Sequence, residues 1–356
     1  MSKKNIIPIF VPHLGCPNDC VFCNQKKIAS ASTNVDEVFV RDKIEEYLGY
    51  FKDKSNVEIA FYGGSFTAIE VSVQSLLLRI AKEYKDRGIV KSIRLSTRPD
   101  CIDEEILSNL KNFGVDTIEL GVQSLDENVL KLSNRGHDAR CVYESSKLIK
   151  ESGFQLGLQQ MIGLPGDSEE LSYYTACEFK KIKPVFVRIY PTLVIVDTKM
   201  ARDYKSGAYV PMSLESTIGI CKELLKFYML NDINVIRIGL QPTENIRLGA
   251  DVVAGPFHPS IRQLVEEELL YDFFVDYFKN MDTAEKVINI YSSNKNISNI
   301  AGQKKSNKNR ISEALNLRDI KLKFKDISDY EFIVLLDQEE FHIDIREHIK
   351  TEIKCT

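Results

Sequence analysis

The sequence predicts an α/β protein, a partial (β/α)6 TIM-like barrel followed by a small C-terminal α+β domain. Short apolar segments alternate with helical segments, the pattern of repeated βαβ units on a parallel sheet. Gly-rich or polar motifs come directly after several of these apolar segments, as expected for a site at the C-terminal rim of a barrel. An open doubly wound sheet is the alternative.

The predicted strands of the barrel are short and rich in β-branched and aromatic residues. They cover residues 6–11, 57–62, 92–96, 117–121, 154–162 and 184–190, with 235–238 as a candidate last strand. The segment VEIAFY at 57–62 is typical, because Gly63 and Gly64 end it abruptly. Six such strands in series correspond to six βα units.

Helices are predicted between the strands from apolar residues at helical spacing. In residues 36–54, for example, Val40, Ile44 and Leu48 recur four residues apart. Further helices are predicted at 69–85, 103–113, 138–152, 168–182, 214–230 and 259–277, whereas 190–211 is assigned to a loop. The helices therefore have the lengths that βα units require.

A division near Thr283 is predicted, with a barrel domain at 1–283 and a small domain at 284–356. Three apolar segments after this point, at 286–292, 320–324 and 330–336, are predicted strands of the small domain.

Composition limits the class of protein. The chain has 356 residues, of which 44% are hydrophobic and 28% are charged, as in soluble globular proteins. Apolar runs are too short for a membrane span, no targeting segment is convincing, and most cysteines are scattered singly. We expect a cytoplasmic protein without disulfides that is not bound to a membrane.

Three cysteines after the first predicted strand point to a metal site. Cys16, Cys20 and Cys23 have the spacing C-x3-C-x2-C. Three thiolates are one ligand short of a closed four-cysteine site, so an iron-sulfur cluster here would keep one iron open. Zinc bound by the three cysteines and His13, or a redox dithiol of Cys20 and Cys23, are the alternatives.

The cysteine loop, together with FYGGSFTAI at 61–69, resembles the radical S-adenosylmethionine (SAM) superfamily. The resemblance implies that the three cysteines hold a 4Fe-4S cluster and that the open iron chelates SAM. It also implies reductive cleavage of SAM to a 5'-deoxyadenosyl radical. Phe22 matches the aromatic residue near the adenine, and Gly63 and Gly64 match the glycines that approach the methionine amino group, where a missing Cβ permits close contact.

Further motifs are similar to the Elongator catalytic-subunit branch of that superfamily, close to the oxygen-independent coproporphyrinogen oxidases. They are STRPD at 96–100, ELGVQSLDENVL at 119–130, NRGHDA at 134–139, LGLQQMIGLPGDS at 156–168, RIGLQPT at 237–243 and AGPFHPSIRQLVE at 254–266. The resemblance covers about residues 5–270. By position it implies SAM contacts from Ser96, Gln123, Arg135 and Gln159.

Candidates for substrate contact or catalysis are His137, Tyr190 and His258, although single residues of these types are more often structural. The resemblance implies RNA, in particular tRNA, as substrate and an electron donor such as flavodoxin or ferredoxin. A small molecule or tetrapyrrole is the second enzyme hypothesis, and a metal-stabilised nucleic-acid-binding module is the non-enzyme one. Acetyl-CoA is not expected as a partner, because the residues after Thr283 lack a Gly-rich acetyl-CoA turn.

A basic segment near the C-terminus is a candidate tRNA contact. Residues 294–325 contain nine Lys or Arg against two acids, among them Lys304, Lys305, Lys308 and Arg310. Such a stripe could neutralise RNA phosphates. The alternative is a solvated face balanced by the acidic residues 326–356, and no aromatic residues alternate with these four cations in the sequence.

Overall fold

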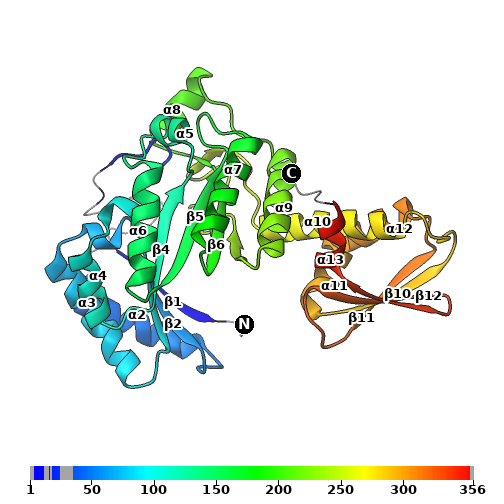
Figure 1. Ribbon diagram of the computed structural model, residues 1–356, viewed down its shortest axis with the longest axis horizontal. Coiled ribbons are helices and arrows are strands. Elements are labelled where there is room, and N and C mark those ends of the chain that lie inside the picture. Colours follow the sequence, from blue (N-terminus) through cyan, green and yellow to red (C-terminus); the bar gives the residue numbers. More distant parts are fainter. Residues whose placement is uncertain (1–3, 12–15, 17, 25–34, 353–356) are drawn as a thin grey trace. The chain divides into compact units, whose positions relative to one another are not determined.

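A computed structural model describes residues 4–11, 16, 18–24 and 35–352 (Figure 1). The chain divides into two compact units, one of Met1–Leu214 with Ile233–Pro259 and one of Glu215–Asp232 with Ser260–Thr356. Each unit has its own sheet.

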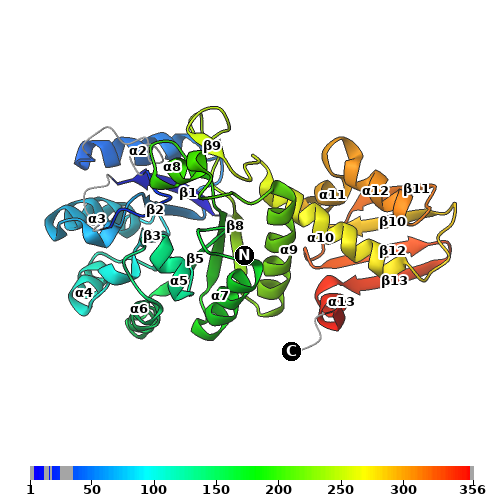
Figure 2. The ribbon, with the colours of Figure 1, turned by 90° about the horizontal axis from the view of Figure 1, so that it is seen from above.

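The first unit is built on a parallel sheet of seven strands in the order β1-β2-β3-β4-β5-β6-β8 (Figure 2). The strands are β1 (Asn5–Phe10), β2 (Val57–Tyr62), β3 (Ser92–Thr97), β4 (Thr117–Gln123), β5 (Gln155–Ile162), β6 (Phe186–Pro191) and β8 (Asn234–Ile238). The order follows the chain without the reversal that a doubly wound sheet requires. The partial barrel is confirmed, and the doubly wound alternative is wrong.

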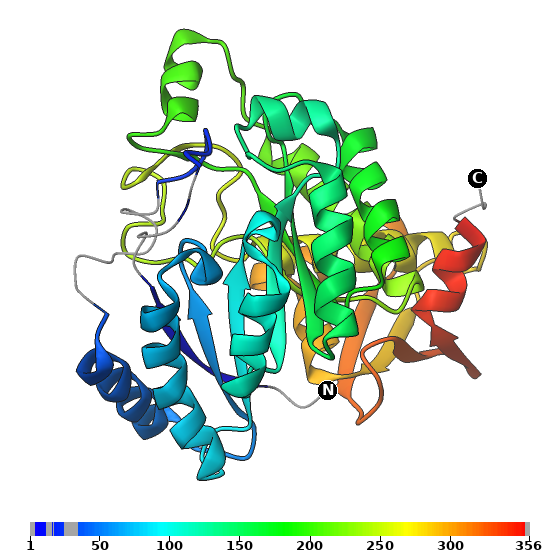
Figure 3. The same cartoon turned by 60° about the vertical axis from the view of Figure 1, so that its left-hand side comes forward.

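Helices cover the outside of this sheet, as Figures 2 and 3 show. They are α2 (Glu37–Tyr50), α3 (Val71–Asp86), α4 (Glu104–Asn112), α5 (Glu127–Leu132), α6 (Ala139–Glu151) and α7 (Glu169–Ile182), with short 3-10 helices η1 (Phe66–Ala68) and η2 (Pro99–Cys101). Their starts follow from side-chain caps, because the side chain before the helix accepts a hydrogen bond from an amide of its first turn. The capping residues of α2, α4, α6 and α7 are Asp36, Asp103, Asp138 and Ser168.

The segment after β6 is not the loop that the sequence analysis assigns. It contains β7 (Val194–Ile195), which pairs antiparallel with β9 (Val252–Ala254), and α8 (Lys199–Ser206). Thr198 caps α8, and Gly207 at φ 80° ends it. The helix buries only Met200 and Ala201, so its sequence lacks the apolar periodicity that predicts a helix.

The second unit contains a four-stranded sheet in the order β11-β10-β12-β13. Its elements are α9 (Leu214–Leu230), α10 (Ile261–Phe278), β10 (Val287–Ser292), α11 (Asn294–Ala301), η3 (Gln303–Lys305), α12 (Ser306–Ala314), β11 (Asp319–Phe324), β12 (Glu331–Leu336), β13 (Glu339–Asp344) and α13 (Ile345–Glu352). Strand β10 is parallel to β11 and antiparallel to β12. The small α+β fold is thereby confirmed.

Helix α10 belongs to the core of the second unit. Phe273 and Phe274 lie 5.5 Å and 5.3 Å, between ring centroids, from Phe332 of β12. The compact units therefore differ from the predicted domains 1–283 and 284–356, because α10 packs on the C-terminal sheet. Where the functional domains divide stays a prediction. None of the helices in the described residues has both the length and the apolar character to cross a membrane.

Candidate functional site

Residues 18–24 of the cysteine loop lie against the turn that follows α5. The amide of Val21 donates to the carbonyl of Ser133 at 3.1 Å, and Asn134 Nδ2 donates to the carbonyl of Asp19 at 2.8 Å. A Cβ added to Gly136 would lie 2.1 Å from Nδ2 of Asn18. The glycine of the NRGHDA motif therefore lets the turn approach the loop closely.

Cys20 is buried beside two arginines. Its Sγ lies 3.4 Å from Nη1 of Arg135 and 3.8 Å from Nη1 of Arg98. Asp100 binds Arg98 with two hydrogen bonds of 2.8 Å, and Arg98 Nη2 donates to the carbonyl of Arg135 at 2.6 Å. Two guanidinium groups fixed beside this sulfur are placed to donate hydrogen bonds to it, as around the sulfur ligands of iron-sulfur clusters.

The other two cysteines are nearby in sequence but do not complete a metal-binding group in this arrangement. Cys16 Sγ donates to the carbonyl of Asn18 at 3.6 Å, and the Cys23 amide donates to the carbonyl of Cys20 at 3.0 Å. Among the described residues no three His, Cys, Asp or Glu side chains gather at metal-binding distance. His13 lies outside the described residues, so the zinc alternative is not tested.

What fits an iron-sulfur cluster is the donor set and its surroundings. All three cysteines are thiols outside any disulfide in the described part of the chain. Thiolates are the usual ligands of such clusters, and hydrogen bonds to the sulfurs adjust their potential. Arg98 and Arg135 are placed to donate such bonds to Cys20.

The backbone at Gly63, just after β2, passes close to Val11, just after β1. The amide of Val11 donates to the carbonyl of Tyr62 at 2.7 Å. Gly63 has φ +90°, and a Cβ built on it would lie 2.6 Å from the carbonyl oxygen of Val11. Beyond Gly64, Ser65 Oγ lies 2.7 Å from Oγ1 of Thr97 and so ties this turn to the end of β3.

Gly63→Ala is expected to destabilise the protein by about 1–3 kcal/mol, because alanine at this φ is strained and its Cβ collides with backbone. Urea unfolding of the metal-free protein measures the loss. Gly49→Ala in α2 is the matched control, since nothing lies within 4 Å of a Cβ there. The control should stabilise by roughly 0.5–1 kcal/mol. Equal effects at both sites would contradict the close approach at Gly63.

A buried network of charges lies inside the half-barrel, and the sequence analysis missed it. Glu119 Oε1 on β4 lies 2.8 Å from Nη1 of Arg94 on β3, and Glu119 Oε2 lies 2.9 Å from Nε of Arg188 on β6. The latter pair has ion-pair distance without hydrogen-bond alignment at Nε. Arg94 Nη2 lies 2.6 Å from Oε2 of Glu58 on β2. Neither Glu119 nor Glu58 is exposed.

Glu119 joins two of the predicted SAM-binding residues. Gln159 Nε2 donates to Glu119 Oε2 at 3.0 Å, and Ser96 Oγ donates to the same oxygen at 3.5 Å. Burial opposes ionisation of Glu119, but the charges of Arg188 and Arg94 and the Gln159 hydrogen bond outweigh it and lower the pKa of Glu119. An ionised Glu119 thus accepts hydrogen bonds that orient the side chains of Ser96 and Gln159.

Gln123 and Arg135, whose side chains both reach Gly121, each leave one polar atom unsatisfied. Arg135 Nη2 donates to the carbonyl of Gly121. A Cβ on Gly121 would lie 3.0 Å from this nitrogen and 3.1 Å from Nε2 of Gln123. Gln123 Oε1 and Arg135 Nε are buried without a hydrogen-bond partner among the described residues. Buried polar atoms of this kind call for a partner, and a bound polar ligand would supply one.

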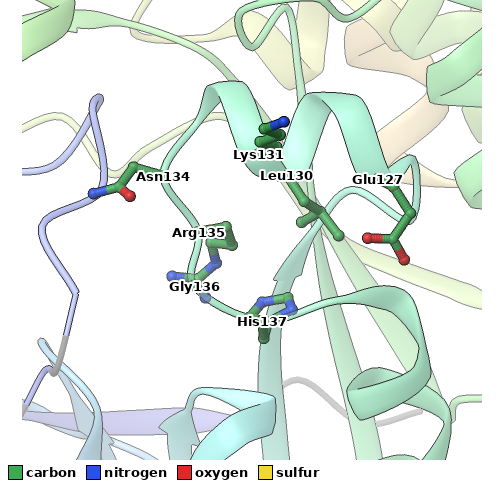
Figure 4. A pocket seen from close by; sticks show the side chains of 7 residues that line it. All are labelled: Glu127, Leu130, Lys131, Asn134, Arg135, Gly136 and His137. Atoms are coloured by element: carbon green, nitrogen blue, oxygen red, sulfur yellow. The ribbon is translucent and has the colours of Figure 1, made fainter.

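A pocket of about 260 Å³ lies beside Arg135 (Figure 4). It is lined by Glu127, Leu130, Lys131, Asn134, Arg135, Gly136 and His137. Burial and, secondarily, the charge of Arg135 lower the pKa of His137 to about 4, although the Asp138 carbonyl 3.3 Å from Nδ1 opposes this. His137 is therefore neutral at pH 7. Polar and charged side chains line the pocket with it, so the pocket suits a polar ligand.

The low pKa of His137 predicts how stability depends on pH. Between pH 6.5 and about 4 the unfolded chain binds a proton at this imidazole and the folded chain does not, so the free energy of unfolding falls as pH falls. His137→Gln should make this fall shallower in that window. Urea unfolding across the window measures it, with His342→Gln, an exposed histidine, as control. Identical pH profiles for wild type and His137→Gln would contradict the assignment.

The remaining candidates lie further along the same unit. Phe22 packs with Val21 on the cluster of Val194, Met200 and Ala201. Tyr190 is half-buried on β6, two residues beyond Arg188. His258 follows β9, next to Phe257, which packs on a second apolar cluster. Roles for Phe22 at the adenine and for Tyr190 and His258 at a substrate stay predictions.

Two of the four cations predicted to contact tRNA are neutralised within the protein. Lys308 pairs with Asp319 at 2.6 Å. Arg310 pairs with Glu268 at 2.9 Å and lies 4.1 Å from the ring centroid of Tyr271. Lys304 and Lys305 are exposed. Both acids lie outside residues 326–356, so Lys308 and Arg310 are balanced, but not by the acidic segment that the sequence suggests.

Two protein-family models match this chain. The model of the radical SAM superfamily matches residues 10–171, and the model of the radical SAM C-terminal domain matches residues 184–271. The two matches together span most of the chain, which belongs to the radical SAM superfamily. Members of this superfamily are enzymes that use a 4Fe-4S cluster and SAM.

Within the superfamily the chain is similar to Elongator-type proteins. It is 31% identical over 206 residues to Elongator complex protein 3 of Dictyostelium discoideum, which covers 52% of the chain and 37% of the relative. It is 24% identical over 306 residues to the tRNA uridine(34) acetyltransferase of Dehalococcoides mccartyi (strain CBDB1), which covers 74% of the chain and 66% of the relative. The chain thus spans between about a third and two thirds of the length of these relatives.

A solved structure has the same fold. The archaeal Elp3 of Methanocaldococcus infernus, with an N-terminal deletion, superposes with a TM-score of 0.59 at 23% identity. The match covers 75% of this chain and 62% of that one. The likeness supports the partial barrel.

Proposed function

We propose that this chain holds a 4Fe-4S cluster through Cys16, Cys20 and Cys23, binds SAM beside it, and cleaves SAM reductively to begin hydrogen abstraction from an RNA substrate. The observation that supports this most is the environment of Cys20. Its sulfur faces Arg98 and Arg135, and Arg135 and Gln123, the latter at the end of β4, present unsatisfied buried atoms. Bound together, the cluster and SAM would supply the electron transfer and the 5'-deoxyadenosyl radical.

The chain's own residues hold and orient the reactants. Arg135 is suited to pair with the SAM carboxylate, since its Nε is buried and unsatisfied. Gly63 and Gly64 expose backbone near the loop, where a carbonyl can accept from the amino group. Ser96 and Gln159 present hydroxyl and amide groups that Glu119 orients.

Exclusion of water is the second task of the protein. Phe22 and Val21 pack against Val194, Met200 and Ala201, so apolar side chains hold this part of the loop against β7 and α8. A dry site protects a reactive radical from side reactions. The electron must come from a partner, for which a flavodoxin or ferredoxin is suited.

RNA, in particular tRNA, is the proposed substrate because the relatives of this chain include tRNA uridine(34) acetyltransferases. A small molecule or tetrapyrrole is the competing hypothesis.

Transfer of a substrate hydrogen tests the choice of substrate. Protein reconstituted anaerobically and reduced with dithionite is incubated with SAM and with tRNA from cells grown in deuterated medium. We expect deuterium in the 5'-deoxyadenosine, measured by mass spectrometry, and none with unlabelled tRNA. The RNA hypothesis would be contradicted if coproporphyrinogen stimulated SAM cleavage while deuterated tRNA gave no deuterium in the 5'-deoxyadenosine.

A further inference from the structure

Within the described residues of the second unit, the helices pack on one face of the four-stranded sheet and leave the other face without a helix. Ile288, Ile290, Phe332 and Val334 are buried, and Phe332 contacts aromatic rings of α10. Figure 1 shows α10 and α12 on one side of this sheet. Because side chains alternate along a strand, the neighbouring residues point to the opposite face. They include Asn289, Tyr291, Lys321, Lys323, Ile333, Leu335 and His342, of which Ile333 alone is buried.

The edge of this face along β11 carries a group of exposed cations. Arg318, Lys321, Lys323 and Lys325 are all exposed. None of the four forms a salt bridge with another residue in the described part of the chain, whereas Asp319, the acid of this strand, is held by Lys308 at 2.6 Å. The surface is therefore complementary to an anion.

An aromatic ring lies among these cations. Tyr291 of β10 is in register with Lys323 of β11. Lys323 Nζ donates to the Tyr291 hydroxyl at 3.2 Å and lies 5.1 Å from the ring centroid. Lys321, two residues away on the same face, stands about 6.6 Å along the strand from Lys323. Strand pairing thus brings together an aromatic residue and lysines that are far apart in the sequence.

We propose that this face binds a single-stranded segment of RNA, with a base on Tyr291 and phosphates on Lys321 and Lys323. Aromatic rings on an open sheet stack unpaired bases, and a neighbouring row of cations follows the backbone. The inference rests on the RNA substrate proposed above. An acidic protein such as an electron donor would use the cations but has no need of the ring, so RNA is favoured.

Binding of a fluorescein-labelled oligouridylate of about twelve nucleotides to the full-length protein over a series of salt concentrations tests this. Lys321→Gln with Lys323→Gln should weaken binding and make the slope of log K against log salt shallower by about 1.4. Tyr291→Leu should weaken binding roughly 5- to 100-fold, whereas Tyr291→Phe should retain most of it.

Two control variants make the test specific. Lys147→Gln with Lys180→Gln removes the same charge from exposed positions of α6 and α7 and should leave affinity and slope unchanged. Lys304→Gln with Lys305→Gln tests the stripe indicated by the sequence and should have a smaller effect than the sheet variants. Thermal unfolding of each variant checks that it is folded.

The result that overturns the proposal is an oligouridylate affinity and salt slope in the Lys321 and Lys323 variant equal to those of the Lys147 and Lys180 control. Unchanged RNA binding together with slower reduction by flavodoxin would assign the face to an acidic protein and would also overturn it. Cleavage of SAM with dithionite and without RNA is measured in parallel. If SAM cleavage is absent while RNA binding is intact, the proposed reaction is wrong. If SAM cleavage is intact while the protein does not bind RNA, the RNA-binding role of this face is wrong.

Discussion

Glu119→Gln is expected to lower the free energy of unfolding by about 3–5 kcal/mol. The substitution removes the charge that faces Arg94 and Arg188 in the interior of the half-barrel. Both guanidinium groups would then be buried with less compensation, and the cost of an unpaired buried charge exceeds the gain of the original pair. Urea unfolding of the metal-free protein measures the effect.

Glu144→Gln is the matched control for this prediction. Glu144 pairs with Arg140 at 2.7 Å on the exposed surface of α6. Exposed helix pairs contribute about 0.3–0.5 kcal/mol, so the control should change stability by no more than that. A loss below about 1 kcal/mol for Glu119→Gln would show that the network does not stabilise the half-barrel in the way the geometry indicates.

Cys20→Ser is expected to abolish iron binding after anaerobic reconstitution and to lower the rate of SAM cleavage by more than about 100-fold. Loss of a ligand should exceed the 10- to 100-fold typical of residues that only support ligands. The serine hydroxyl is a poor replacement for a thiolate that faces Arg98 and Arg135. Iron content and 5'-deoxyadenosine formation are the two measurements.

Cys177→Ser on α7 is the control, because this half-buried cysteine lies outside the loop. It should keep both iron and activity. If the two variants retain equal iron and equal rates, Cys20 is not a ligand and the proposed site is misplaced.

The partial barrel could be predicted from the sequence because its central strands are buried on both sides or nearly so. Strand β4, for example, is buried along its full length, and such segments appear as apolar runs. The helices between them begin at side chains such as Asp103 and Ser168, whose capping role depends only on local sequence. Short elements such as α8 and β7 carry too few buried residues to give a periodic pattern.

The charged network could not be predicted, because it depends on register between distant strands. Glu119 meets Arg188 only because β4, β5 and β6 align side by side, and the two residues are 69 positions apart. A charged residue at the centre of an apolar strand is the sequence signal that could have indicated it. Likewise, the pair of Tyr291 and Lys323 forms across β10 and β11, so no spacing in the sequence reveals it.

The cysteine spacing, in contrast, could be recognised from sequence alone, and the structure adds the surroundings of one cysteine. Arg98 and Arg135 come from two separate motifs, STRPD and NRGHDA, that the fold brings to the same sulfur. The resemblance assigned Arg135 to SAM and said nothing of Arg98. Asp100 and the carbonyl of Arg135 hold Arg98 in place. Arg98 therefore links the turn that carries Arg135 to the sulfur of Cys20.

The measurement that tests the central claim most directly is anaerobic reconstitution with iron and sulfide, followed by reduction in the presence of SAM. We predict a 4Fe-4S cluster whose electron paramagnetic resonance signal changes when SAM is added, and formation of 5'-deoxyadenosine and methionine in equal amounts. A protein that binds zinc but no cluster, or a reconstituted cluster that yields no 5'-deoxyadenosine on reduction, would contradict the claim.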